Sequence, residues 1–121
     1  VHENDGKWSL PGGWVDVNVS VGENVVKEVK EESGLDVITE KVIAIQDRSK
    51  HNLPIYAYGI CKIFVQCSVI GGKFEENNET TEYRYFSISE LPELATEKNT
   101  VEQIKMCFEA YKSDNWKTLL D

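Results

Sequence analysis

Three glutamates form the clearest chemical pattern in the sequence. Glu28, Glu31 and Glu32 lie at positions i, i+3 and i+4, so on a helix their side chains would be neighbours on one face. Unpaired carboxylates at such short range repel one another, and each raises the pKa of the others. A divalent cation such as Mg²⁺ removes this cost because it binds carboxylate oxygens. By itself, however, the spacing is more typical of a solvated acidic helix surface.

The residues around the glutamates predict the helix that must position them. Ser20 is a favourable N-cap, and Glu23 follows at the spacing of a capping box. Gly34 fits the left-handed residue that commonly ends a helix. The sequence therefore predicts a helix between Ser20 and Gly34, with an apolar stripe formed by Val25, Val26 and Val29.

The rest of the chain predicts several strands and one more helix. Runs of apolar or alternating residues predict strands at 7–10, 37–46, 55–70 and 83–88. Thr100 and Gln103 suggest a second helix cap, and the helix after it would face the core with Val101, Ile104, Phe108 and Tyr111. This mixture predicts an α+β or layered α/β/α domain.

Length and charge limit the classes of function. The 121 residues are enough for one domain, and the net charge of −8 offers no general basic surface for nucleic acid or an anionic membrane. No apolar run approaches the ~18 residues of a membrane span. The three cysteines form no C-x-x-C pair and are expected to be reduced, mostly buried thiols of a cytoplasmic protein.

The segment from Gly13 to Leu35 resembles the signature of the Nudix hydrolase family, G-x5-E-x7-R-E-U-x-E-E-x-G-U, where U is aliphatic. The preceding Leu10-Pro11-Gly12-Gly13 also resembles the usual lead-in to that signature. Within this family the chain most resembles bacterial ADP-ribose pyrophosphatases and related CDP-choline pyrophosphatases. The positions that match the family signature are Gly13, Glu28, Val29, Glu31, Glu32, Gly34 and Leu35.

The resemblance implies a fold and a reaction. The expected fold is a single Nudix α/β/α sandwich over residues 1–121 with a mixed sheet, lacking N-terminal elements that relatives possess. The expected reaction is Mg²⁺-dependent hydrolysis of a nucleoside diphosphate derivative, with Mn²⁺ as a substitute metal. ADP-ribose is the leading substrate, and CDP-choline, NADH and dinucleoside polyphosphates stay open. The resemblance also makes a homodimer a candidate assembly.

Particular residues receive roles from the resemblance. Glu28, Glu31, Glu32 and the backbone carbonyl of Gly12 would bind the metal. Two signature positions differ, since Val19 replaces a glutamate and Lys27 an arginine that brace the loop against the helix in the family. A binding or regulatory module that lost turnover is therefore an alternative.

The general base and the substrate contacts are less closely defined by the sequence. Glu79 and Glu82, in an acidic loop before a predicted strand, are the first candidates for the base, and a glutamate of the signature helix is another. Arg48 and His51 could contact phosphate or ribose, and Tyr58 could stack on a base. Incidental surface charge and ordinary packing are the alternatives for these three residues.

Overall fold

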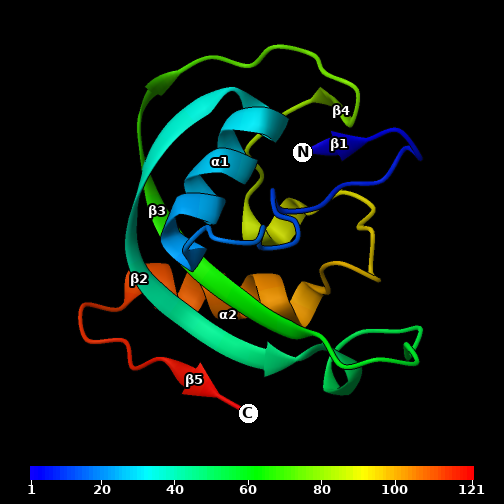
Figure 1. Cartoon of the computed structure of the whole chain (residues 1–121), viewed down its shortest axis with the longest axis vertical. Coiled ribbons are helices and arrows are strands. Elements are labelled where there is room, and N and C mark those ends of the chain that lie inside the picture. The colour runs from blue at the N-terminus through cyan, green and yellow to red at the C-terminus, as the bar shows by residue number, and fades with distance from the viewer.

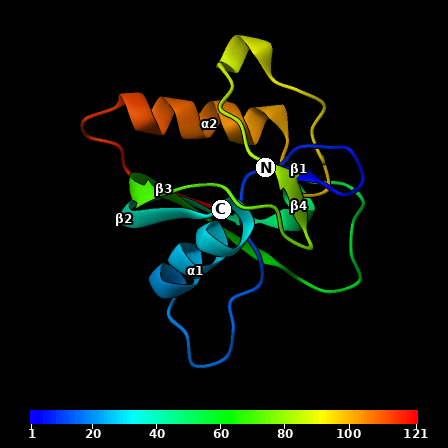
Figure 2. The ribbon, with the colours of Figure 1, turned by 90° about the horizontal axis from the view of Figure 1, so that it is seen from above.

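The computed structural model describes residues 1–121, and its helices and strands form three layers. A long, curved hairpin of β2 (Leu35–Asp47) and β3 (Cys61–Gly72) lies in the middle. Helix α1 (Val21–Ser33) covers one side of this hairpin and α2 (Val101–Lys112) covers the other, as Figure 2 shows. The predicted α/β/α arrangement is confirmed (Figure 1).

The sheet is mixed, as predicted. β2 is the central strand, with β3 antiparallel on one side and the short β5 (Leu119–Leu120) parallel on the other. A separate pair joins β1 (His2–Glu3) to β4 (Thr80–Glu82) in antiparallel register, with Glu3 opposite Thr80. Between the sheet and α2 lies a small core of Ile43, Ala44, Phe64 and Ala110.

Helix α1 begins and ends where the sequence predicts. The Ser20 hydroxyl accepts a hydrogen bond from the Glu23 N–H at 3.1 Å. Gly34 has φ 75°, and a Cβ there would come within 2.0 Å of the Lys73 carbonyl oxygen, so this position requires glycine. The buried residues of α1 are Asn24, Glu32 and Ser33, all polar. The predicted apolar stripe is only partly right, because Val25 and Val29 are half-buried and Val26 is exposed.

Helix α2 carries the predicted capping box of Thr100 and Gln103. Its predicted apolar stripe is only partly right, because Tyr111 is 72% exposed while Ile104 is buried. Gln103 is buried in place of an apolar residue. Its side-chain amide is satisfied there by hydrogen bonds to the side chains of Gln46 and Asn52 at 3.0 and 2.7 Å.

The predicted strand at 55–70 is too long at its start. The chain forms the 3₁₀ helix η1 (Arg48–Lys50) and then an irregular, exposed loop up to Ile60, and β3 begins only at Cys61. In the loop, Tyr56 stacks on Tyr58 with ring centroids 5.7 Å apart. These apolar residues thus contact one another locally instead of pairing with β2.

Two other predicted strands are replaced by packing of single aromatic rings. Residues 83–88 form no strand; β4 precedes them and the 3₁₀ helix η2 (Ile88–Glu90) follows. Phe86 packs edge-on against Trp8 at 4.9 Å, and Tyr83 lies 5.4 Å from Phe74. Of residues 7–10, only Trp8 makes β-bridges, to His2 and Leu94. Contacts between separate segments thus partly cover these rings without a sheet ladder.

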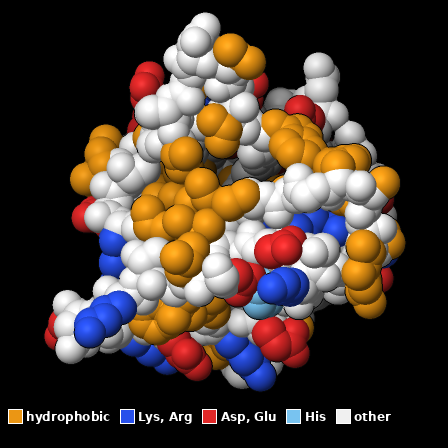
Figure 3. All heavy atoms as spheres, turned by 60° about the horizontal axis from the view of Figure 1, so that its bottom comes forward, with side chains coloured by type: hydrophobic (Ala, Val, Ile, Leu, Met, Phe, Trp, Pro, Cys, Tyr) orange, Lys and Arg blue, Asp and Glu red, His pale blue; other side chains and the backbone are white.

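The surface carries exposed apolar and charged groups side by side. On the face in Figure 3, hydrophobic side chains form a patch bordered by interspersed acidic and basic side chains. All three cysteines are free; Cys61 is exposed, and Cys67 and Cys107 are half-buried, so the expectation of mostly buried thiols is wrong. No helix of this structure has the length and apolar character needed to cross a membrane.

Candidate active site

Two glutamates of α1 contact the glycine turn that precedes the helix. The backbone N–H of Gly12 donates a hydrogen bond of 2.7 Å to Oε2 of Glu32. The Glu28 carboxylate lies against Gly13, where an added Cβ would come within 2.7 Å of Oε1. A side chain at Gly13 would displace the Glu28 carboxylate from this position, so the turn and the two glutamates are packed together.

Both carboxylates are largely removed from water. Glu32 is 6% exposed, and its pKa is raised to about 7. Burial is the main cause; the hydrogen bond from the Gly12 N–H opposes the rise, and the charges of Glu28 and Glu79 contribute to it. The Glu28 side chain is 13% exposed, and burial is also the main cause of its raised pKa. Ionising this pair is costly, and a nearby cation would offset the cost.

Glu31 takes a different position from its two neighbours. Its side chain is 53% exposed and pairs with Lys27 at 3.2 Å. No three acidic, histidine or cysteine side chains are arranged to ligate one ion together. Of the predicted triad, Glu28 and Glu32 both lie against the glycine turn with little exposure, whereas Glu31 is exposed. The hard oxygen donors and raised pKa values of this pair fit a hard divalent cation.

Lys27 connects the loop to the helix although it replaces the family's arginine. Its Nζ lies 2.9 Å from the Asp16 carboxylate and 3.9 Å from that of Glu28. The pKa of Lys27 is raised by its hydrogen bonds to Asp16 and Glu31. Asp16 thus supplies an ionic contact that Val19 cannot make. No sequence pattern marks Asp16, because its role depends on how the loop turns back toward α1.

The two candidate bases in the acidic loop have different surroundings. The charge of Glu79 contributes to the raised pKa of both Glu28 and Glu32. Glu82 instead forms an ion pair with Arg84. The residue after Glu79, Thr80, donates a hydrogen bond to the backbone carbonyl of Glu32, so the chain at Glu79 contacts the end of α1.

The three predicted substrate contacts are engaged elsewhere. Arg48 is 4% exposed, donates to the backbone carbonyls of Pro54 and Glu97, and lies over the Tyr56 ring. His51 pairs with Asp121 at 2.8 Å, and Tyr58 stacks on Tyr56. The guanidinium of Arg48 thus holds its own loop, and none of these three side chains contacts Glu28, Glu31 or Glu32.

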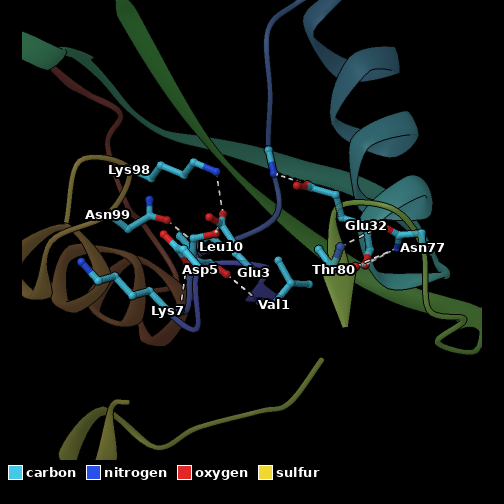
Figure 4. A network of polar contacts seen from close by, with 12 residues as sticks. Val1, Glu3, Asp5, Lys7, Leu10, Glu32, Asn77, Thr80, Lys98 and Asn99 are labelled. Atoms are coloured by element: carbon cyan, nitrogen blue, oxygen red, sulfur yellow. Dashed lines mark hydrogen bonds and ion pairs between the residues drawn. The ribbon is translucent and has the colours of Figure 1, made fainter. Parts of the chain in front are cut away.

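Two residues before α2 complete the surroundings of the pair. The Asn99 side chain accepts a hydrogen bond from the Leu10 N–H at 2.8 Å and so fixes the start of the glycine turn. Lys98 pairs with Glu3 at 2.6 Å, and its charge also acts on Glu32, which it faces in Figure 4. No sequence motif marks either residue, since they approach the site from the opposite end of the chain.

The buried pair predicts a pH-dependent stability when divalent metal is absent. Because the pKa of Glu32 rises from 4.5 to about 7 on folding, the folded state binds more protons between these values, and stability falls as pH rises through them. The loss should be about 1–3 kcal/mol between pH 5 and pH 8. Urea denaturation in EDTA would measure it. Glu32→Gln should remove most of this dependence, and an equal loss in that variant would contradict the assignment.

The comparisons with known proteins agree with this geometry. The family model described as NUDIX domain matches residues 1–106. A solved ADP-ribose pyrophosphatase from Streptococcus suis is 50% identical, with a TM-score of 0.92 over 100% of this chain and 87% of that one. A UDP-X diphosphatase structure is 31% identical, with a TM-score of 0.89 over 98% of this chain and 58% of that one.

Curated relatives give the same family and are longer. A putative ADP-ribose pyrophosphatase, YjhB, from Bacillus subtilis is 40% identical over 98% of this chain. An ADP-ribose pyrophosphatase from Methanocaldococcus jannaschii is 31% identical over 74% of it. The chain spans 57% and 52%, respectively, of the length of these two relatives. The match over residues 1–106, together with the shared fold, shows that this chain belongs to the NUDIX domain family.

Proposed function

We propose that this protein hydrolyses the diphosphate linkage of a nucleoside diphosphate derivative, with ADP-ribose as its substrate and Mg²⁺ as its metal. The observation that carries the proposal is the buried pair Glu28 and Glu32 packed against Gly12 and Gly13. Similarity to proteins named ADP-ribose pyrophosphatase supports this choice of substrate.

Glu28 and Glu32 would hold the metal, with Glu31 and the backbone of Gly12 as further candidate ligands. When bound, the metal supplies positive charge that neutralises the diphosphate and favours attack by water. The contact of Lys27 with Asp16 holds the loop against α1 and keeps Gly12 and Gly13 beside the two carboxylates.

The protein must also accept a proton. Water attacks one phosphorus, the bond from that phosphorus to the bridging oxygen breaks, and the products from ADP-ribose are AMP and ribose 5-phosphate. Glu79 is the side chain we assign to take the proton from the attacking water. Glu79 precedes Thr80, which is hydrogen-bonded to the Glu32 carbonyl, and its charge contributes to the raised pKa of Glu28 and Glu32. These two observations support Glu79 over Glu82, whose carboxylate is paired with Arg84.

A panel of nucleotides tests the proposal. We expect release of monophosphate from ADP-ribose with Mg²⁺ at a kcat/KM at least about tenfold above that for CDP-choline, NADH or UDP-sugars, and none in EDTA. Anion-exchange chromatography would quantify the products. Faster turnover of UDP-sugars would favour the activity of the UDP-X diphosphatase neighbour.

The same panel separates the enzyme from a binding module. Binding of ADP-ribose by calorimetry without turnover of any diphosphate would establish the binding or regulatory alternative. The contact between Lys27 and Asp16 supports the enzyme over that alternative. It links the loop to α1 even though Val19 and Lys27 replace the glutamate and arginine of the signature.

A further inference from the structure

The loop that carries Glu79 is attached to the residue that would bind the metal. The Thr80 hydroxyl donates a hydrogen bond of 2.5 Å to the backbone carbonyl of Glu32, and the Asn77 side-chain amide donates to the same oxygen at 3.3 Å. Figure 4 shows both side chains directed at this carbonyl from the loop beside β4. Glu32 is therefore held at two ends, by Gly12 at its carboxylate and by the loop at its backbone.

The carbonyl of Glu32 needs such a partner because it lies in the last turn of α1. The last four carbonyl groups of a helix accept no hydrogen bond from an N–H within the helix. A carbonyl that is buried without any hydrogen-bond partner destabilises the folded protein. The carbonyl of Lys30 accepts from the Gly34 N–H, whereas that of Glu32 depends on Thr80 and Asn77. Thr80 is 1% exposed, so water cannot easily replace its hydroxyl.

The same asparagine fixes the backbone of Glu79. The Asn77 side-chain oxygen accepts hydrogen bonds from the N–H groups of Glu79 and Thr80, both at 2.9 Å. Its amide also donates to the Thr80 hydroxyl at 2.7 Å. Glu79 thus stands between two residues that are both bonded to Glu32. Thr80 is secured further by its pairing with Glu3 across β1 and β4.

We propose that Asn77 and Thr80 are positioning residues that set Glu79 at a fixed place relative to Glu28 and Glu32. The inference rests on the proposed function, in which Glu79 takes the proton and the α1 glutamates hold the metal. Catalysis is sensitive to such placement, since a shift of about 1 Å in a reacting group can lower the rate ~10²-fold. The bonds of Asn77 and Thr80 make the loop and the end of α1 move as one unit.

Thr80→Val and Thr80→Ser form a matched pair for the test. Valine keeps the shape and loses the hydroxyl, whereas serine keeps the hydroxyl. We expect Thr80→Val to lower kcat for ADP-ribose about tenfold or more, with KM and the Mg²⁺ concentration for half-activity changed less than threefold. Thr80→Ser should stay within about threefold of wild type in all three constants. Asn77→Asp, which retains the acceptor oxygens and loses the donors, should resemble Thr80→Val.

A double variant distinguishes positioning of Glu79 from a purely structural role. If Thr80 acts through Glu79, Thr80→Val should lower kcat less than twofold when added to Glu79→Gln, because the group it places is already gone. A further loss equal to that in wild type would overturn the inference, as would a lowered melting temperature with unchanged kcat. Absence of turnover in the wild-type protein would overturn the proposed function and the inference together, whereas full activity in Thr80→Val would overturn the inference alone.

Discussion

Replacing Glu32 by glutamine is expected to lower kcat for ADP-ribose on the order of 10²–10³-fold while leaving the fold intact. Glutamine retains an oxygen that can accept the hydrogen bond from the Gly12 N–H, so the turn should keep its position. What it removes is the negative charge that would hold the metal. Because that charge is buried beside Glu28, the variant should be at least as stable as wild type at pH 8 in EDTA.

Loss of activity with unchanged or increased stability separates a functional charge from a structural one. Activity would be measured at saturating Mg²⁺, and stability by urea denaturation monitored by circular dichroism. Glu31→Gln is the control on the same helix face; its effect should be smaller, because Glu31 is exposed and already paired with Lys27. An unchanged rate in Glu32→Gln would mean that the metal binds elsewhere.

The elements predicted well are those whose signals are local. Ser20, Glu23 and Gly34 act within a few residues of themselves, so the limits of α1 could be read directly. Residues 83–88 alternate like a strand, yet Phe86 packs against Trp8, a partner far away in the sequence. Alternation of apolar and polar residues indicates that every second side chain packs against the protein. It does not indicate whether the packing partner belongs to a neighbouring strand or is a single aromatic ring.

The residues of the candidate site show the same difference between local signals and tertiary contacts. Glu28 and Glu32 were predictable because one helix sets their spacing and the family signature surrounds them. Asp16, Asn77, Thr80 and Lys98 carry no motif, and their importance comes from tertiary contacts with Lys27 and Glu32. Arg48 had the right chemistry for phosphate, but its guanidinium is buried on backbone carbonyls that no local pattern could indicate.

Glu79→Gln is expected to lower kcat by about 10²-fold or more, whereas Glu82→Gln should change it less than about threefold. Removal of a general base commonly costs 10²–10⁴-fold. The two glutamates lie three residues apart with different partners, since Glu79 acts on the α1 pair and Glu82 binds Arg84. Metal affinity, measured by Mn²⁺ titration, should be nearly unchanged in both variants if Glu79 acts on water and not as a ligand.

Two outcomes of these measurements would contradict the assignment of Glu79 as the base. If Glu82→Gln were instead the inactive variant, the base would lie in β4, and the hydrogen bonds of Asn77 and Thr80 would serve only to close the end of α1. Loss of Mn²⁺ binding in Glu79→Gln would indicate that Glu79 is a metal ligand. A glutamate of α1 would then be the remaining candidate for the base.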